Sequence, residues 1–194
     1  GGMMDLNIRL NKETNKEISV AIGDLYRATR KINILAGNEA LTMDRFDTQL
    51  AAVEEELQEL IDGYESRNLG IMVDSVVDGL VTVSELISIL DGNDDITKDN
   101  PLVSLFNLNG DCVEVLIRQA IECYNNEDYI NLLGKLEDLC VVLNAPMVDN
   151  IYEVLESNNS KFITTKELDE SGESEFSICE QIEAEGRYED VYSE

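Results

Sequence analysis

The sequence predicts an all-α protein with a four-helix-bundle-like core of two helical hairpins. Apolar residues recur at helical spacing along nearly the whole chain. The 194 residues include only two prolines, the residue that breaks helices most strongly. Residues 53–83 also align without a gap with residues 113–143, where six of the 31 pairs are identical. Such a repeat of amphipathic segments favours two similar hairpins that bury their apolar faces together.

The first two helices are predicted from apolar stripes and capping residues. One stripe covers residues 18–32, and Gly37 is expected to end that helix. Thr42 or Asp44 caps the second helix, whose apolar stripe covers residues 46–60.

The remaining helices follow from the same signals, and together they complete the two hairpins. A third helix is expected from about Leu69 to Leu90, and the acidic, turn-rich segment 92–101 is expected to be a loop. The fourth runs from its cap at Asp111 through Tyr124, and the fifth from about Asp128 to Leu143. A short sixth helix covers about residues 148–156.

Composition divides the chain into three parts. Residues 1–16 are expected to be a remnant of an N-terminal tag and a lead-in, and residues 17–163 the helical domain. Residues 164–194 form an acidic extension with 11 acidic and two basic residues, where one helix at about 175–184 is plausible. The extension stops abruptly, as a truncated chain would.

Charge and missing residue types exclude several functions. With 41 acidic and 14 basic residues, the formal charge of −27 argues against binding to nucleic acid or to anionic membranes. The chain has no histidine, which excludes histidine-based triads and zinc sites. No apolar stretch is free enough of charge to span a membrane. The four cysteines form no CxxC pair, so we expect reduced thiols in the cytoplasm.

Four carboxylates are predicted to meet between the second and third helices. Glu56 and Glu59 are three residues apart and reach the same side of one helix. Asp74 and Asp78 are four residues apart on the next helix, which the short turn near residues 67–68 makes an antiparallel neighbour. Two carboxylates from each helix can therefore converge on one point.

The third helix indicates that these carboxylates face the interior. It is apolar nearly all round, so its narrow polar stripe of Asp74, Asp78, Thr82 and Glu85 is expected to face another element. Residues 46–97 contain 13 acidic residues and one basic residue, Arg67, too few cations to balance the charge. A divalent cation with hard oxygen ligands, Mg²⁺ or Mn²⁺, would balance it. The second predicted hairpin lacks this cluster of carboxylates.

Three motifs resemble those of a known superfamily. Residues 54–60 (EEELQEL) resemble the EExxE motif of the all-α nucleoside triphosphate pyrophosphohydrolases, the MazG-like and phosphoribosyl-ATP pyrophosphohydrolase group. Residues 74–80 (DSVVDGL) are similar to the second motif of its phage-type members, and residues 157–162 (SNNSKF) to the segment that follows the bundle. The resemblance covers about residues 20–163. One departure is Ile71, where many members carry a glutamate.

The resemblance implies an enzyme that cleaves a nucleoside triphosphate between its α- and β-phosphates, releasing a monophosphate and pyrophosphate. It implies Mg²⁺, or Mn²⁺, as the cofactor. The implied metal ligands are Glu56, Glu59, Asp74 and Asp78. Glu56 and Glu59 are the implied catalytic residues, with Glu56 able to accept a proton from the attacking water.

The same resemblance implies further residues and partners. Lys161 would hold phosphate oxygens and Asn158 would bind base or sugar, whereas Glu55 points away from Glu56 and has a supporting role. The implied partner is a nucleoside triphosphate, most simply a deoxynucleotide. A homodimer or homotetramer in the cytoplasm of a bacterial or phage-infected cell is expected, with no nucleic-acid or membrane partner.

Three alternatives remain open from the sequence. A non-enzymatic acidic helical protein could mimic DNA or mask a basic partner, although clustering of carboxylates on an apolar helix speaks against it. Phosphoribosyl-ATP could be the substrate, and the fold could have lost catalysis, as Ile71 allows. A calcium loop of EF-hand type is unfavourable, because residues 91–95 lack its spacing.

Overall fold

The computed structural model describes residues 13–35, 42–91, 112–144 and 146–159. Within these ranges the chain forms six helices and no strand, which confirms the all-α prediction. The helices are α2 (Asn15–Leu35), α3 (Met43–Glu65), α4 (Leu69–Asp91), α5 (Cys112–Asn125), α6 (Tyr129–Leu143) and α7 (Met147–Asn159). The loop expected at 92–101 and the helix expected at 175–184 lie outside the described residues.

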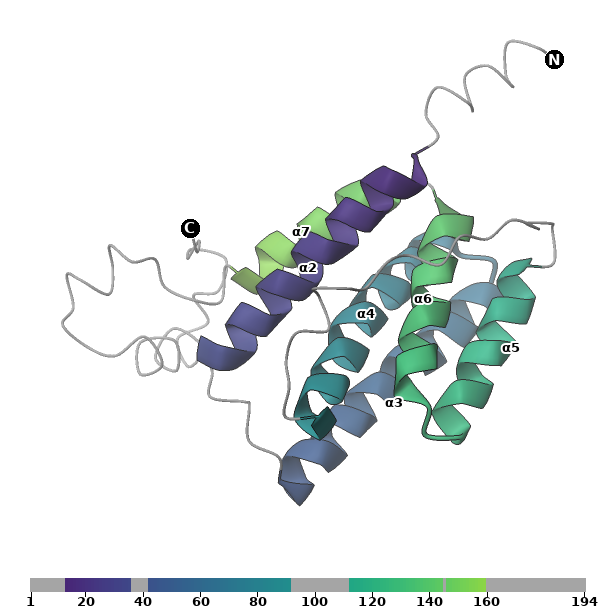
Figure 1. The fold of residues 1–194 in the computed structure, drawn as a ribbon. Helices are drawn as coiled ribbons and strands as arrows, with labels where there is room; N and C mark the ends of the chain where they lie inside the picture. Colours follow the sequence, from purple (N-terminus) through teal and green to yellow (C-terminus); the bar gives the residue numbers. More distant parts are fainter. Residues whose placement is uncertain (1–12, 36–41, 92–111, 145, 160–194) are drawn as a thin grey trace, which may run out of the picture.

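Helix α4 lies at the centre of a helical bundle. It packs against α3 on one side and α6 on the other, and α5 packs against α6 (Figure 1). Helices α2 and α7 run side by side and cover a further face of α4. This central position explains why α4 is apolar nearly all round: a helix with neighbours on several sides has little surface left for solvent.

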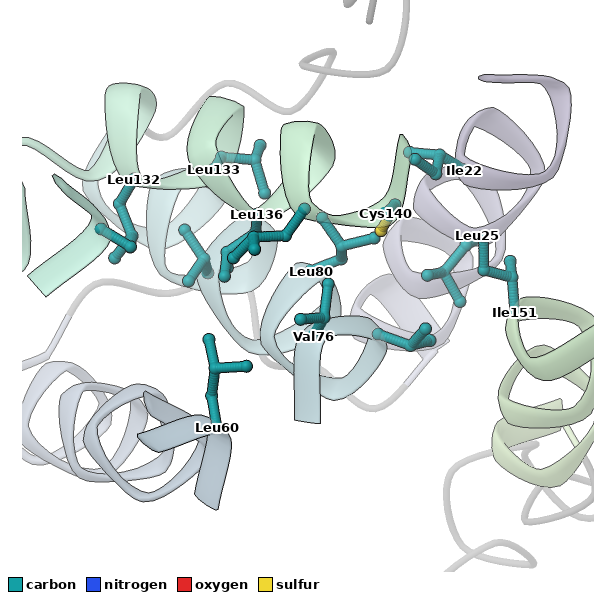
Figure 2. Close-up of a cluster of buried hydrophobic side chains, with 14 of the residues drawn as sticks. Ile22, Leu25, Leu60, Val76, Leu80, Leu132, Leu133, Leu136, Cys140 and Ile151 are labelled. Atoms are coloured by element: carbon teal, nitrogen blue, oxygen red, sulfur yellow. The ribbon is translucent and has the colours of Figure 1, made fainter. Parts of the chain in front are cut away.

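The hydrophobic core forms around two fully buried residues of α4, Val76 and Leu80. Figure 2 shows side chains from four other helices gathered around them. These are Leu25 of α2, Leu60 of α3, Leu136 and Cys140 of α6, and Ile151 of α7, each at most 1% exposed. Complete burial of one such aliphatic side chain contributes about 1.5–3 kcal/mol, so the helical layers are held together mainly through α4. Cys123 and Cys140 are free thiols.

Both hairpin turns have the same backbone conformation at equivalent positions. Helix α3 ends at residue 65 and α5 at residue 125, and the next helices begin at residues 69 and 129. Arg67 and Glu127 each take up a left-handed conformation, with φ of 57° and 59°. In each turn an N–H donates to the carbonyl five residues earlier, Asn68 to Gly63 at 2.8 Å and Asp128 to Cys123 at 2.9 Å. This pattern closes the end of a helix in a Schellman motif.

The same residues begin the second helix of each hairpin. The Asn68 side-chain oxygen accepts from the Ile71 N–H at 3.1 Å, and the Asp128 carboxylate accepts from the Asn131 N–H at 3.2 Å. Both bonds satisfy an N–H that would otherwise lack a helical partner. The repeat in the sequence is therefore matched by a repeat in the structure, with the same offset of 60 residues.

Where the structure describes them, the helix boundaries agree with the expected ones; the end expected at Gly37 and the cap expected at Asp111 lie outside the described residues. Thr42, one of the two expected caps, accepts the Arg45 N–H with its side-chain oxygen at 3.1 Å and begins α3. Helix α7 begins at Met147, one residue before the expected start. Helix α2 begins at Asn15, inside the segment 1–16 that the sequence predicts to be a tag remnant and lead-in. Glu13, two residues earlier, already contacts another helix. Its carboxylate accepts the Val148 N–H at 3.0 Å.

Gly63 allows the first hairpin to pack closely. A Cβ atom added there would lie 2.9 Å from a side-chain carbon of Ile71 and 3.1 Å from the backbone N of Met72. A larger residue would therefore push apart the two helices that carry the predicted carboxylates. In the part of the chain that the structure describes, no helix combines the length and apolar character that crossing a lipid bilayer requires.

Candidate active site

Three members of the predicted polar stripe of α4, Asp78, Thr82 and Glu85, lie along α3, whereas the fourth, Asp74, contacts α7. The Gln49 side chain of α3 donates to the Thr82 carbonyl at 2.7 Å, and Arg45 lies 3.8 Å from the Glu85 carboxylate. One to two turns earlier on α4, Asp78 is half-buried and interacts electrostatically with Glu56. Thr82, Glu85 and Asp78 therefore lie along one seam between the two helices, which we call the α3–α4 seam.

Glu56 is a carboxyl group of this seam whose pKa is strongly raised by its surroundings. Its side chain is half-buried, and its Oε2 atom is buried without a hydrogen-bond partner. Burial is the largest cause that raises the pKa of Glu56 to about 8, followed by repulsion from Asp78 and Glu59 and, more weakly, from Glu55. A carboxylate surrounded by other carboxylates must hold a proton or attract a cation, because its charged form is poorly solvated there.

Two of the other predicted ligands act on Glu56 by charge. Glu59 lies one helical turn away on α3, and Asp78 acts from the facing helix. Glu59 is exposed, so the site opens to solvent on its side. Glu55 is exposed as well, which agrees with its predicted orientation away from Glu56.

Asp74, the fourth predicted ligand, has a different environment. It is exposed, and its Oδ1 atom accepts a hydrogen bond of 2.7 Å from the side-chain amide of Asn150 in α7. It is not among the groups that raise the pKa of Glu56. Asp74 is therefore tied to α7, one helical turn from Asp78 on the same helix.

The two predicted substrate residues lie near the end of α7. Asn158 is half-buried in the last turn of that helix. Lys161 lies outside the described residues. Ile71, at the position of the glutamate in the related motif, is 41% exposed and packs against Gly63.

Two contacts of the site could not be found by sequence analysis. One is the Asn150–Asp74 bond, and the other is a bond of 3.1 Å from the Tyr124 hydroxyl to Glu54. Both join residues at least 70 positions apart, on helices whose mutual packing no local pattern specifies. The sequence contained only an indirect indication of the Tyr124 contact: Tyr124 and Tyr64 form one of the identical pairs of the repeat.

The described carboxylates have the right chemistry for a cation but are not arranged around one point. Among residues 13–35, 42–91, 112–144 and 146–159, no three acidic or cysteine side chains form a group that could hold a metal ion. The unpartnered Oε2 of Glu56, the neighbouring Glu59 and the facing Asp78 nevertheless supply the oxygen donors that Mg²⁺ and Mn²⁺ prefer. Carboxylate side chains on two fixed helices can approach an ion by changing rotamer alone.

Comparison with known proteins identifies no relative of this chain. The sequence matches no protein-family model, no curated protein and no solved structure. The functional argument therefore rests on the three motifs of the sequence and on the α3–α4 seam.

Proposed function

We propose that this protein is a metal-dependent nucleoside triphosphate pyrophosphohydrolase of the MazG-like superfamily, with its active site in the α3–α4 seam. The observation that carries the proposal is the buried, unpartnered Oε2 of Glu56 among the carboxylates of Glu59 and Asp78. Such a group needs a proton or a cation, because an unpaired buried charge costs several kcal/mol. A bound divalent cation would supply the opposite charge.

Glu56, Glu59, Asp74 and Asp78 would hold Mg²⁺ or Mn²⁺. When bound, the cation supplies charge neutralisation for the triphosphate and lowers the pKa of a ligated water. Glu56 is the residue best suited to accept the proton of the attacking water, because its second oxygen has no other partner. The surrounding apolar residues of α4, such as Val76 and Val77, exclude bulk water from the buried side of the seam.

The substrate would extend from the seam toward the residues that follow α7. Lys161 would bind phosphate oxygens and Asn158 would form hydrogen bonds to the base or sugar. Two stacked hairpins are the core that the resemblance implies, and a homodimer or homotetramer belongs to the same proposal. Deoxynucleoside triphosphates are the first substrates to try, followed by ribonucleotides and phosphoribosyl-ATP.

Product analysis tests the reaction directly. Purified protein is incubated with each triphosphate and Mg²⁺, and pyrophosphate and orthophosphate are measured separately. We expect pyrophosphate and a nucleoside monophosphate, with no turnover in excess EDTA. Orthophosphate with a nucleoside diphosphate would refute the assigned bond.

Glu59→Gln tests the residues, with Glu122→Gln as the matched control. Both positions are exposed glutamates on the outer helix of a hairpin, but only Glu59 belongs to the seam. Turnover should fall at least 100-fold in Glu59→Gln and stay within about two-fold in Glu122→Gln. Equal turnover in both variants would refute the site.

One observation favours a second candidate, a non-enzymatic acidic binding protein. Glu54, Glu55, Glu59 and Asp62 are exposed on α3, so this helix presents a negatively charged surface. Such a surface would bind a basic partner with strong salt dependence and without a cation. If no triphosphate is hydrolysed and Mg²⁺ causes no shift in Tm, this second function becomes the better one.

A further inference from the structure

A groove lies at one end of the bundle, between the carboxyl end of α4 and the turn that joins α5 to α6 (Figure 1). It has a volume of about 200 Å³ and is lined by Ile87, Leu90 and residues 127–130 (EDYI). Ile87 is buried, whereas Leu90 is 40% and Ile130 is 67% exposed. The groove is smaller than typical small-molecule sites of about 300–1,000 Å³, so it suits one or two aliphatic side chains of a larger partner.

The rim of the groove is negatively charged. Glu127 is exposed, and Asp128 beside it is half-buried at the start of α6. Burial, and after it the charge of Glu127, raises the pKa of the Tyr129 hydroxyl, so the negative potential reaches a residue that lines the groove. The last turn of α4 contains no basic residue, so its own side chains do not offset the negative end of the helix dipole. This end of the bundle therefore attracts basic side chains.

The turn does not need these residues in order to form. The equivalent turn of the first hairpin has the same backbone conformation, with φ of 57° at Arg67 and 59° at Glu127, but its sequence at residues 67–70 is RNLG. An arginine thus occupies the position of Glu127, and Gly70 the position of Ile130. The exposed isoleucine and the acidic rim are therefore features of the second hairpin that its backbone does not explain.

We propose that this groove binds a partner protein through a short segment in which an aliphatic side chain is flanked by lysine or arginine. The aliphatic side chain would contact Leu90 and Ile130 above the buried Ile87, and the basic side chains would face Glu127. This interaction does not depend on the proposed hydrolase. A second copy of the chain fits less well: across a two-fold axis the two acidic rims would meet, and each chain has a formal charge of −27.

Selection from a random library of phage-displayed peptides tests the chemistry of the partner. Phage that bind the Ile130→Ser variant are removed first, and the remainder is selected on the full parental chain. We expect the selected peptides to combine an aliphatic residue with neighbouring lysine or arginine. Selected peptides without basic residues would overturn the proposal. Selection of no peptide would overturn it as well, and is the result expected if the chain's own segment 101–108 (PLVSLFNL) fills the groove.

The affinity of a selected peptide for further variants tests its place of binding, with fluorescence anisotropy as the measurement. Leu90→Ser should weaken binding at least about 10-fold, because it removes an apolar contact from the centre of the interface. Glu127→Arg, which introduces the residue of the first hairpin, should weaken binding at low salt and reduce its salt dependence. Val20→Ser is the matched control: Val20 is 52% exposed on α2, and its loss should change affinity less than about two-fold.

The remaining outcomes also decide the proposal. Glu127 is exposed, so Glu127→Arg remains informative if Leu90→Ser does not fold. Parental affinity in the folded variants would overturn binding at the groove. Analytical ultracentrifugation of the parent and of Ile130→Ser tests a second copy as the occupant. A parental dimer that Ile130→Ser dissociates would assign the groove to self-association and overturn the basic partner.

Discussion

The two hairpins of the molecule share a backbone but differ in the charge between their helices. Their turns agree in φ and in hydrogen bonding, residue by residue. Asp78 of the first hairpin corresponds to Asp138 of the second, yet the positions of Glu56 and Glu59 are occupied by Leu116 and Gln119. The second hairpin shows that this backbone folds without the glutamates, so the fold does not require them.

If the proposed function is right, the difference separates residues kept for packing from residues kept for chemistry. Leu116 is 5% exposed and contributes to the core, whereas Glu56 at the equivalent position is half-buried and leaves one oxygen unpartnered. Replacing a buried leucine by a glutamate lowers stability unless something compensates for the charge. Both hairpins contain a buried carboxylate with an unpartnered oxygen, Glu56 in the first and Asp138 in the second, but only Glu56 stands where the other hairpin has an apolar residue.

The largest expected effect is a loss of turnover in the Glu56→Gln variant, which tests whether the hairpins differ in function. If Glu56 accepts the proton of the attacking water, its loss should lower kcat by about 10²–10⁴-fold. At pH 7 the metal-free protein should become more stable by roughly 1–2 kcal/mol, a value reduced for partial solvent screening, because glutamine is buried without the cost of protonating a carboxylate. Assays of turnover and urea denaturation in EDTA measure both, and Glu114→Gln on α5 is the matched control. A variant with full turnover would show that the hairpins do not differ in function.

Tyr26→Phe tests how the second hairpin supports its own buried charge. Glu137, only 2% exposed, accepts a bond of 3.0 Å from the Tyr26 hydroxyl of α2, whereas the equivalent position in the first hairpin is the apolar Val77. Removal of the hydroxyl should lower the free energy of unfolding by about 1–3 kcal/mol, the usual range for a bond to a buried charged group.

Tyr124→Phe is the control for that change, because its bond to Glu54 is exposed and should be worth less than about 0.5 kcal/mol. Equal effects of the two substitutions would mean that Glu137 does not depend on α2.

The pH dependence of stability should also distinguish the hairpins. Burial raises the pKa of Asp138 to about 6, although the nearby Lys135 opposes this, and the pKa of Glu56 to about 8. Both groups bind protons more tightly in the folded chain. Their stabilising effect is therefore complete below the unfolded pKa of about 4 and is lost as pH rises through the folded value.

In EDTA the free energy of unfolding should fall from about pH 4 upward, more steeply below pH 6, where both groups contribute, than between pH 6 and 8, where only Glu56 does; each group contributes about 1–2 kcal/mol after allowing for solvent screening. Chemical denaturation between pH 4.5 and 9 measures this. Asp138→Asn should make the fall below pH 6 less steep, and Glu56→Gln should remove the fall between pH 6 and 8. A profile that Asp138→Asn leaves unchanged would contradict the assignment to the second hairpin.

The sequence predicted the helices well because their signals are local. Thr42 as the cap of α3, the apolar character of α4 and the short turns near residues 67 and 127 are each determined within a few residues. The offset of 60 residues between the hairpins was likewise visible in the sequence, although only six of 31 positions are identical.

The candidate site could be predicted only in part, because it combines local and non-local features. The spacing of Glu56 with Glu59 and the antiparallel pairing of α3 with α4 were visible in the sequence, and the charges of Glu59 and Asp78 both act on Glu56. The partner of Asp74 depends on how α7 docks against α4, which is set by core packing around Ile151 and not by any motif near Asn150.

The smallest expected effect sharpens the comparison most directly, because it concerns the feature that the hairpins share. Arg67 and Glu127 are exposed and have φ near +58°, a conformation that costs a residue with a Cβ atom about 1 kcal/mol. Glycine removes that cost but increases the entropy of the unfolded chain, so Arg67→Gly and Glu127→Gly should each stabilise by up to ~0.5 kcal/mol.

Because exposed charges contribute little, the two gains should agree within about 0.3 kcal/mol and add in the double variant, whose sites lie in separate turns. Urea denaturation of the three variants measures this. A gain at one turn with a loss at the other would mean that the hairpins differ in backbone strain as well as in charge, and the first hairpin could then no longer be explained as the second with carboxylates added.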